Sequence, residues 1–315
     1  MIPWLLALLG LVILLLAGDA LVKGAVNLSL RLGVPALIIS LTIVAFGTSA
    51  PELLISIKAV TENAPGIALG NVVGSNTANI LMVLGIPALM KALHTSECET
   101  RKTYLFMIGA SVLFIGLAFG GVFTIWSGII LLTALSLVLA DAFRDAHNHH
   151  KAGIADELDE LEEADPDMPY WRLGLYIVLG MIGLPLGANL LVENATVIAR
   201  LYGVSDTVIG LTLVAVGTSL PELATTVMAA LRRQADVALG NVIGSNMFNL
   251  LAIIGVATFF GPIPVDEEFL EFDLWVMLGA SLLLIPFVFF RQDITRLWGG
   301  VLSVLYITYV CVLLS

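Results

Sequence analysis

Two glutamates, Glu52 and Glu222, each end the same short motif, G-T-S-x-P-E, inside stretches that are otherwise apolar. In the first copy Thr48 and Ser49 add hydroxyl oxygens. The motif's proline removes a backbone donor and clashes with the carbonyl four residues before it, so carbonyls near Ala45 lose their normal helical partners. Carboxylate, hydroxyl and carbonyl oxygens are hard ligands, of which Ca²⁺ takes about six to eight. These residue types therefore predict binding of Ca²⁺ or Na⁺.

A second motif, G-N-V-x-G-S-N-x-x-N, follows each glutamate motif. It places Ser75 and Asn79 four residues apart, on one face of a helix. Gly70 and Gly74 have the same spacing, which allows helices in membranes to approach closely. Two facing copies would form one cage with two carboxylates. The predicted ligands are Thr48, Ser49, Glu52, Ser75, Asn79, Thr218, Ser219, Glu222, Ser245 and Asn249, with the carbonyls of Ala45 and Ala215.

The charge of such a cage restricts its chemistry. Two ionised glutamates would balance one Ca²⁺ or two Na⁺, so a site that holds either in turn could exchange them. No histidine lies in a predicted span, which disfavours a histidine proton relay, although the glutamates could carry protons themselves. The structural alternative for one G-T-S-x-P-E motif is a capped proline kink. A second buried glutamate at a matching position favours ion binding.

The elements that carry these motifs are predicted to cross a membrane. The chain has 315 residues, of which 59% are hydrophobic and only 12% charged. Soluble proteins are about one quarter charged, and a membrane helix needs about 20 apolar residues. We therefore expect an all-α membrane protein with ten spans. They are placed at 3–22, 36–61, 66–91, 104–119, 122–141, 173–195, 206–230, 236–260, 273–290 and 296–313.

A constant offset of 170 residues aligns the two halves of the chain. Between residues 33 and 85, 25 of 53 positions are identical to those of the second half without a gap. Each half has five predicted spans, and an odd number turns the second copy upside down relative to the first. We therefore expect two inverted five-helix repeats, 1–141 and 171–315, joined by an acidic linker at 142–170. Inverted repeats that meet at the membrane midplane are typical of secondary transporters.

The distribution of basic residues predicts an orientation, because cytoplasmic loops carry the excess of Lys and Arg. With an outside N-terminus, only Lys58 and Arg200 of the 14 basic residues lie outside. This predicts extracellular termini, a cytoplasmic 142–170 loop and a plasma membrane location. The formal net charge of −11 comes largely from that loop and from 266–273. It gives no basic patch for nucleic acid.

The four motif copies resemble those of the cation/calcium exchanger superfamily, within it the prokaryotic sodium/calcium antiporters. The match extends across the whole ten-span layout. The resemblance implies that Glu52 and Glu222 ligate both Ca²⁺ and Na⁺, and that the other predicted ligands complete the sites. Some family members, including potassium-dependent ones, have aspartate at the position of Asn249, so the asparagine here argues against potassium coupling.

We therefore expect a secondary antiporter that exchanges Na⁺ for Ca²⁺ by alternating access. It would not be an enzyme and would need no cofactor, its partners would be the two ions and the lipid bilayer, and it would function as a monomer. Two alternatives stay open. The same glutamates could serve a proton-coupled exchanger of Ca²⁺ or another divalent cation, or a passive cation channel, although channels are usually built as rings around an axis.

Overall fold

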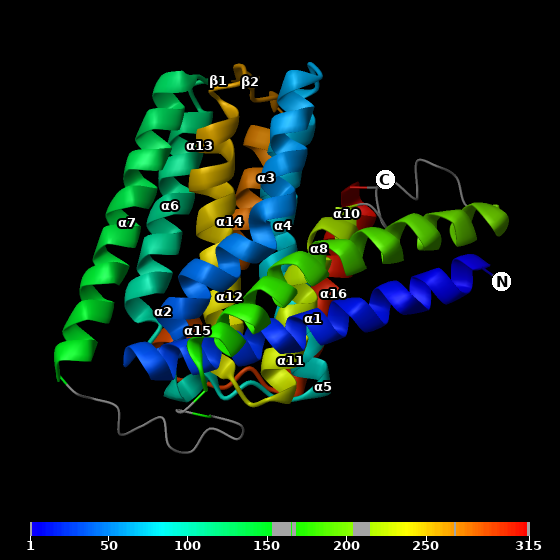
Figure 1. Cartoon of the computed structure of the whole chain (residues 1–315). Helices are drawn as coiled ribbons and strands as arrows, with labels where there is room; N and C mark the ends of the chain where they lie inside the picture. The colour runs from blue at the N-terminus through cyan, green and yellow to red at the C-terminus, as the bar shows by residue number, and fades with distance from the viewer. Residues whose placement is uncertain (1, 153–164, 166–167, 204–214, 268, 314–315) are drawn as a thin grey trace.

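The computed structural model describes residues 2–152, 165, 168–203, 215–267 and 269–313, and it is almost entirely helical (Figure 1). The first half contains α1 (Ile2–Leu32), α2 (Ala36–Ile39), η1 (Ser40–Val44), α3 (Ala45–Thr61), α4 (Pro65–Ala78), η2 (Asn79–Val83), α5 (Gly85–Met90), η3 (Thr95–Glu97), α6 (Arg101–Ala118), β1 (Val122–Phe123) and α7 (Ile125–Ala152). The second half contains α8 (Tyr170–Leu201), α10 (Ala215–Thr218), α11 (Leu220–Leu231), α12 (Ala235–Met247), η5 (Phe248–Ile253), α13 (Ile254–Ala257), β2 (Ile263–Pro264), η6 (Phe269–Asp273), α14 (Leu274–Leu282), α15 (Ile285–Phe289) and α16 (Arg296–Leu313).

Within these described residues, nine helices are long and apolar enough to cross a membrane. They correspond to nine of the ten predicted spans. The remaining span, predicted at 206–230, lies partly outside the described residues, and its described part forms α10 and α11. The membrane class and the helical fold are therefore confirmed, whereas the count of ten stays a prediction.

Several helices extend beyond their predicted ends. The first was predicted at 3–22, but α1 continues to Leu32, with Lys23 inside the helix one turn after Asp19, whose carboxylate lies 3.4 Å from Lys23 Nζ. Gly33, with φ of 63°, ends the helix, since this backbone conformation costs a glycine little. In the same way α7 continues to Ala152, so residues 142–152 of the predicted linker are helical.

The helices α1 and α8 lie side by side and cross the other spans at a steep angle (Figure 1). They have 31 and 32 residues, which at about 1.5 Å per residue exceeds the roughly 30 Å of a hydrocarbon core. Helices of this length must tilt. They also approach each other closely, because a Cβ atom on Gly187 would lie 2.7 Å from the Leu14 nitrogen.

The spans that carry the second motif form the centre of the molecule. In the most apolar stretches of Pro65–Met90 and Ala235–Ala257, 83% and 94% of the residues are buried. Each of these spans changes from α-helix to a π-helical turn at the motif's last residues, in η2 and η5. π-Helical turns inside α-helices frequently occur at functional sites. The second motif therefore lies at the core rather than on the lipid-facing surface.

Backbone features recur between the two halves at the offset of 170. Positive φ angles occur at Gly33 and Gly203 (63° and 78°), at Asn63 and Arg233 (60° and 57°), and at Gly121 and Arg291 (78° and 50°). The two residues of each pair are 170 positions apart in the sequence. The sequence repeat is thus also a repeat of turn geometry.

The connecting segments gather at two ends of the molecule. At one end β1 pairs with β2 in antiparallel register, with Phe123 opposite Ile263. At the other end Leu93 and Ile294 form an isolated antiparallel bridge, near α5 and α15 (Figure 1). Ile263 belongs to a loop predicted to lie outside, whereas Leu93 and Ile294 belong to loops predicted to lie inside.

An ion pair holds α1 against the end of α11. The Arg232 Nε atom donates to Asp19 Oδ1 at 2.6 Å, and Lys23 Nζ lies 3.4 Å from Asp19 Oδ2. Only about a fifth of each of the Asp19 and Arg232 side chains is exposed. The contact joins the steeply tilted pair of helices to the helix that carries Glu222.

Close packing of α12 against η1 and α3 gives a first prediction. A Cβ atom on Gly244 would lie 2.5 Å from the Leu41 carbonyl oxygen and 2.6 Å from Ala45 Cβ. Gly244→Ala is therefore expected to destabilise the protein by about 1–3 kcal/mol, the usual cost of overpacking. Thermal unfolding in detergent would show a lower transition temperature.

Gly279→Ala is the matched control, because no described atom lies within 4 Å of the added Cβ position. Alanine is also the better helix former by about 1 kcal/mol, so this variant should keep or raise the transition temperature. Equal losses in both variants would contradict close packing at Gly244.

Candidate cation site

The two glutamate motifs have different backbone conformations. The helix α3 runs through the first motif, with Pro51 in its interior. In the second motif α10 ends at Thr218, and α11 begins after Ser219 with Pro221 in its first turn, where a missing N–H is tolerated. Both Glu52 and Glu222 are nevertheless 1% exposed.

Side chains from the two halves meet at Glu222. The Ser49 hydroxyl, from the first half, donates to Glu222 Oε1 at 3.2 Å. The Ser245 hydroxyl, from the second half, donates to the same oxygen at 3.5 Å. The Glu52 carboxylate lies close enough to Glu222 for electrostatic repulsion between them. Residues far apart in the sequence thus form one polar centre.

Thr48 is the second point of contact between the halves. Its hydroxyl lies 3.2 Å from the Asn241 Oδ1 atom and 3.3 Å from the Ser245 hydroxyl. It also lies 3.2 Å from the Ala45 carbonyl oxygen, which can accept its proton. The carbonyl that was predicted to lack a helical partner is therefore within reach of a hydroxyl from its own helix.

The asparagines of the second motifs lie beside this centre. The Asn79 amide donates to Asn246 Oδ1 at 3.0 Å, which joins η2 to α12. The Asn246 side-chain amide in turn donates to the main-chain carbonyl of Asn76 at 3.4 Å. Asn79, Asn246 and Asn249 are each 1% exposed, so this network is shielded from solvent.

Several buried polar atoms at this centre have no hydrogen-bond partner among the described residues. They are Glu52 Oε2, Glu222 Oε2, Ser219 Oγ, Asn79 Oδ1, and both amide atoms of Asn76 and of Asn249. A buried polar atom without a partner costs about 1–3 kcal/mol. Six of these eight atoms belong to predicted ligands. This set can therefore supply free oxygens to a bound cation.

No basic side chain of the described residues pairs with either glutamate. Lys58, on the same helix as Glu52, lies 3.8 Å from Glu62 instead, and both side chains are exposed. The described residues also contain no group of three or more His, Cys, Asp or Glu that could hold a metal. A cation at this centre would depend on two carboxylates and many neutral oxygens.

The structure brings the predicted ligands together to different degrees. Hydrogen bonds join five of the predicted ligands in one network: Ala45, Thr48, Ser49, Glu222 and Ser245. Ser75 is buried, and Thr218 is half-buried at the end of α10. Ala215 is the first residue of α10. Whether these residues ligate ions stays a prediction.

Two further pairs of asparagines were missed by the sequence analysis. The Asn71 amide donates to the Glu52 carbonyl at 3.2 Å, and the Asn241 amide donates to the Glu222 carbonyl at 3.4 Å. Asn76 and Asn246 form the second pair. All four recur at the offset of 170 within the quoted motif, which was a usable signal. Asn71 and Asn241 also lie four residues before Ser75 and Ser245, so the same helical spacing could have identified them.

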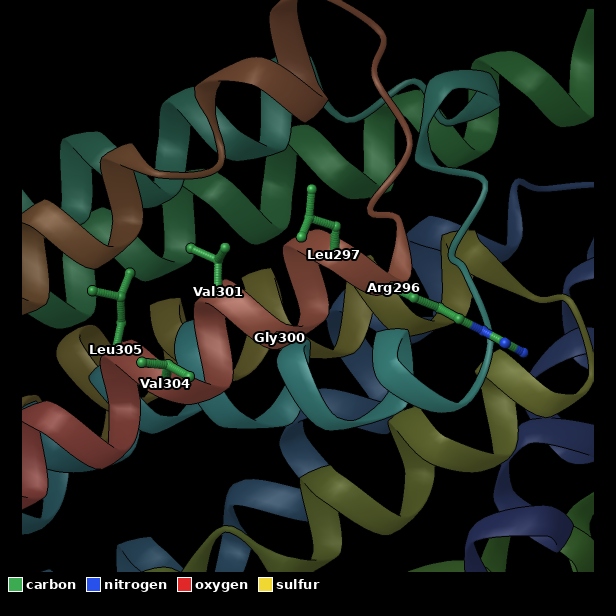
Figure 2. A pocket seen from close by; sticks show the side chains of 6 residues that line it. All are labelled: Arg296, Leu297, Gly300, Val301, Val304 and Leu305. Carbon is green, nitrogen blue, oxygen red and sulfur yellow. The ribbon is translucent and has the colours of Figure 1, made fainter.

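A groove on the outer surface of α16 has no link to this centre. Its lining is Arg296, Leu297, Gly300, Val301, Val304 and Leu305 (Figure 2). Apart from Arg296 these residues are apolar, and none is a predicted ligand. The groove is suited to a lipid environment rather than to an ion.

Comparison with known proteins identifies the family. The family described as sodium/calcium exchanger protein matches residues 2–142 and 173–315, which include all four motif copies. This chain belongs to the sodium/calcium exchanger family. The sodium/calcium exchanger MaX1 of Methanosarcina acetivorans is 36% identical over 344 residues, with 99% of this chain and 98% of MaX1 covered.

Two further similar proteins support the assignment. The inner membrane protein YrbG of Escherichia coli is 33% identical over 280 residues, with 88% of this chain and 86% of YrbG covered. The structure of the sodium-calcium exchanger NCX_Mj, soaked with zero Na⁺ and Ca²⁺, superposes with a TM-score of 0.82. It is 32% identical, and 99% of this chain and 98% of NCX_Mj are covered. The predicted resemblance is confirmed, and this exchanger is a transporter, not an enzyme.

The asparagine network gives a second prediction. Asn246→Leu would leave the Asn79 amide without its partner, so we expect a loss of about 1–3 kcal/mol. Asn76→Leu is the matched control, because both amide atoms of Asn76 lack partners among the described residues. Thermal unfolding in detergent without Ca²⁺ should show a loss only for Asn246→Leu. A larger loss for Asn76→Leu would refute this network.

Proposed function

We propose that this exchanger moves Ca²⁺ against Na⁺ by alternating access, with both ions bound between Glu52 and Glu222. One observation carries the proposal: two carboxylates lie buried and close together, and no described basic residue neutralises them. Burial of an uncompensated charge is costly. Two positive charges, from one Ca²⁺ or two Na⁺, would remove that cost.

The predicted ligand set is proposed with this function. The free carboxylate oxygens, the Ser219 hydroxyl and the Asn79 and Asn249 amide oxygens would surround the ions, together with Thr48, Ser49, Ser75, Thr218, Ser245 and the Ala45 and Ala215 carbonyls. Such oxygens suit both ions, since Ca²⁺ is a hard cation. The names of MaX1 and NCX_Mj as sodium/calcium exchangers support Na⁺ and Ca²⁺ as the transported pair.

The two halves are proposed to be inverted repeats of five spans, 1–141 and 171–315, joined by the 142–170 linker. Leu93 and Ile263 are equivalent by the offset, yet they belong to the connections at opposite ends of the molecule. Inverted repeats in transporters place the ion site near the membrane midplane. A monomer would then suffice, because one chain supplies both halves of the cage.

The end that holds the Leu93 bridge is proposed to face the cytoplasm. There the Lys91 Nζ atom donates to the Leu231 carbonyl, and the Arg296 guanidinium donates to the Met90 carbonyl. Basic residues concentrate in cytoplasmic loops. Both termini would then be extracellular, in a plasma membrane, and the name of YrbG as an inner membrane protein agrees with this location.

Transport by purified protein in liposomes tests the function. Vesicles loaded with Na⁺ should take up radioactive Ca²⁺ when an outward Na⁺ gradient is imposed. Glu52→Gln and Glu222→Gln should each abolish this uptake, because each removes one of the two charges that neutralise the ions. Glu62→Gln, at the residue that follows α3 and with a side chain 64% exposed, is the matched control and should keep wild-type uptake.

The same vesicles separate the competing functions. A proton gradient of equal size should not drive uptake, and Ca²⁺ should not enter without either gradient. Uptake driven by protons alone would identify a proton-coupled exchanger. Uptake without any gradient of a counter-ion would identify a channel. Unchanged Na⁺-driven uptake in both glutamine variants would refute the site.

The orientation is tested by labelling single cysteines in intact cells. His94 and Glu62 have side chains 63% and 64% exposed and lie at opposite ends. Burial and the Asp236 carboxylate raise the pKa of the native Cys98 thiol, which slows its reaction with a maleimide. Cys98 and Cys311 are nevertheless replaced by alanine, so that only the introduced thiol can be labelled. A membrane-impermeant maleimide should label Glu62→Cys and not His94→Cys. The reverse pattern would invert the proposed topology.

A further inference from the structure

The side chain of Asn241 lies between the two halves of the polar centre and is 0% exposed. Its Oδ1 atom is 3.2 Å from the Thr48 hydroxyl of α3. Its amide nitrogen is 3.4 Å from the Glu222 carbonyl of α11 and 3.2 Å from the Thr226 hydroxyl. Asn241 thus contacts ligand-bearing residues of both glutamate motifs, although it was not among the predicted ligands.

The orientation of this amide is fixed by its partners. The Glu222 carbonyl is an acceptor only, so the amide must present its N–H₂ group to Glu222. The carbonyl oxygen of the amide must then face Thr48. The same arrangement recurs at the offset of 170, where the Asn71 amide donates to the Glu52 carbonyl at 3.2 Å and the Ser56 hydroxyl at 3.1 Å.

The Thr48 hydroxyl has a single proton and three acceptors within reach. The Ala45 carbonyl and Asn241 Oδ1 both lie 3.2 Å away, and the Ser245 hydroxyl lies 3.3 Å away. When the proton points to Ala45, it occupies that carbonyl. When the proton points to Asn241, the nearer of the other two acceptors, the Ala45 carbonyl and the lone pairs of the hydroxyl oxygen are both free. A cation is attracted by lone pairs and repelled by an O–H proton, so the orientation toward Asn241 offers both oxygens.

We propose that Asn241 is a positioning residue: it accepts a hydrogen bond from the Thr48 hydroxyl and so leaves the Thr48 and Ala45 oxygens available to the transported cation. The inference rests on the proposed function, because Thr48 and Ala45 are ligands only if ions bind here. Asn241 does not touch the ion itself. It acts through Thr48, as groups hydrogen-bonded to ligands commonly do at metal sites.

The test is a double-mutant cycle in the liposome assay, read as the Na⁺ concentration that gives half-maximal Ca²⁺ exchange. In Asn241→Leu the new side chain has nearly the same shape as asparagine but accepts no hydrogen bond. This variant should raise the half-maximal Na⁺ concentration about tenfold or more. Thr48→Ala should raise it similarly. The double variant should be no worse than Thr48→Ala alone, because coupled residues give non-additive effects. Additive losses would overturn the inference.

Two more variants separate proton acceptance from packing. Asn241→Asp keeps an acceptor for Thr48 and loses the amide donor, so its half-maximal Na⁺ concentration should lie within about threefold of wild type or below it. Thr226→Val removes the other partner of the Asn241 amide and should leave the value unchanged. A tenfold rise in either variant would assign the effect to the α11–α12 contact and overturn the acceptor role.

These outcomes are distinct from failure of the proposed function. If wild-type vesicles show no Na⁺-driven uptake, the function itself is wrong. If wild type and the Glu62→Gln control transport normally and Asn241→Leu matches them in its half-maximal Na⁺ concentration, only the role of Asn241 is refuted. Where Asn241→Leu fails to fold, Asn241→Asp and Thr226→Val still decide between the two roles.

Discussion

A carboxylate can be buried only where its charge is balanced, and this constraint applies twice at the centre of this molecule. Glu52 and Glu222 are both 1% exposed and close enough to repel each other. Removing a charge from water costs far more than a hydrogen bond returns. The pair can be neutral through protons or balanced by metal cations, and the neutral oxygens around it are of the kind that hard cations bind. Much of the remaining architecture serves to bring these two side chains, which are 170 positions apart, into one small space.

The segments that surround the two glutamates depart from regular α-helix. A proline follows each Thr-Ser pair and removes a backbone donor, and π-helical turns begin beside the motif asparagines in η2 and η5. The π-helical turns lie within the two most buried of the described spans, where unsatisfied backbone groups are tolerated only if they line protein or a cavity. Neutral ligands also keep the total charge low, so a bound ion could be released again. An exchanger needs such moderate affinity, whereas a permanent metal centre does not.

The sequence predicts the family, the membrane class and the helical fold well, because each depends on patterns that one chain displays directly. The contacts of Asn241 could not be predicted in this way. Helical spacing shows which residues share a face of one helix, whereas Thr48 lies in the other half of the chain. The interruption of the helix at Ser219, between α10 and α11, could not be predicted either. The two G-T-S-x-P-E motifs match at every specified position, yet α3 is continuous and α10 is separate from α11. Their different surroundings, rather than local sequence, must decide between these backbones. The extension of α1 to Leu32 was missed because a single lysine was taken as the end of an apolar run.

The ion pair between Asp19 and Arg232 breaks the likeness of the two halves. At the offset of 170 the corresponding residues are Asn189 and Glu62, and Glu62 lies near Lys58 instead. A transport cycle in which the two halves exchanged conformations would break the contact between Asp19 and Arg232. It would form no equivalent contact, because Asn189 carries no charge. The opposite-facing conformations would then differ in free energy even with identical ions bound. Under the proposed alternating access, this unmatched contact would give the exchanger a preferred resting side.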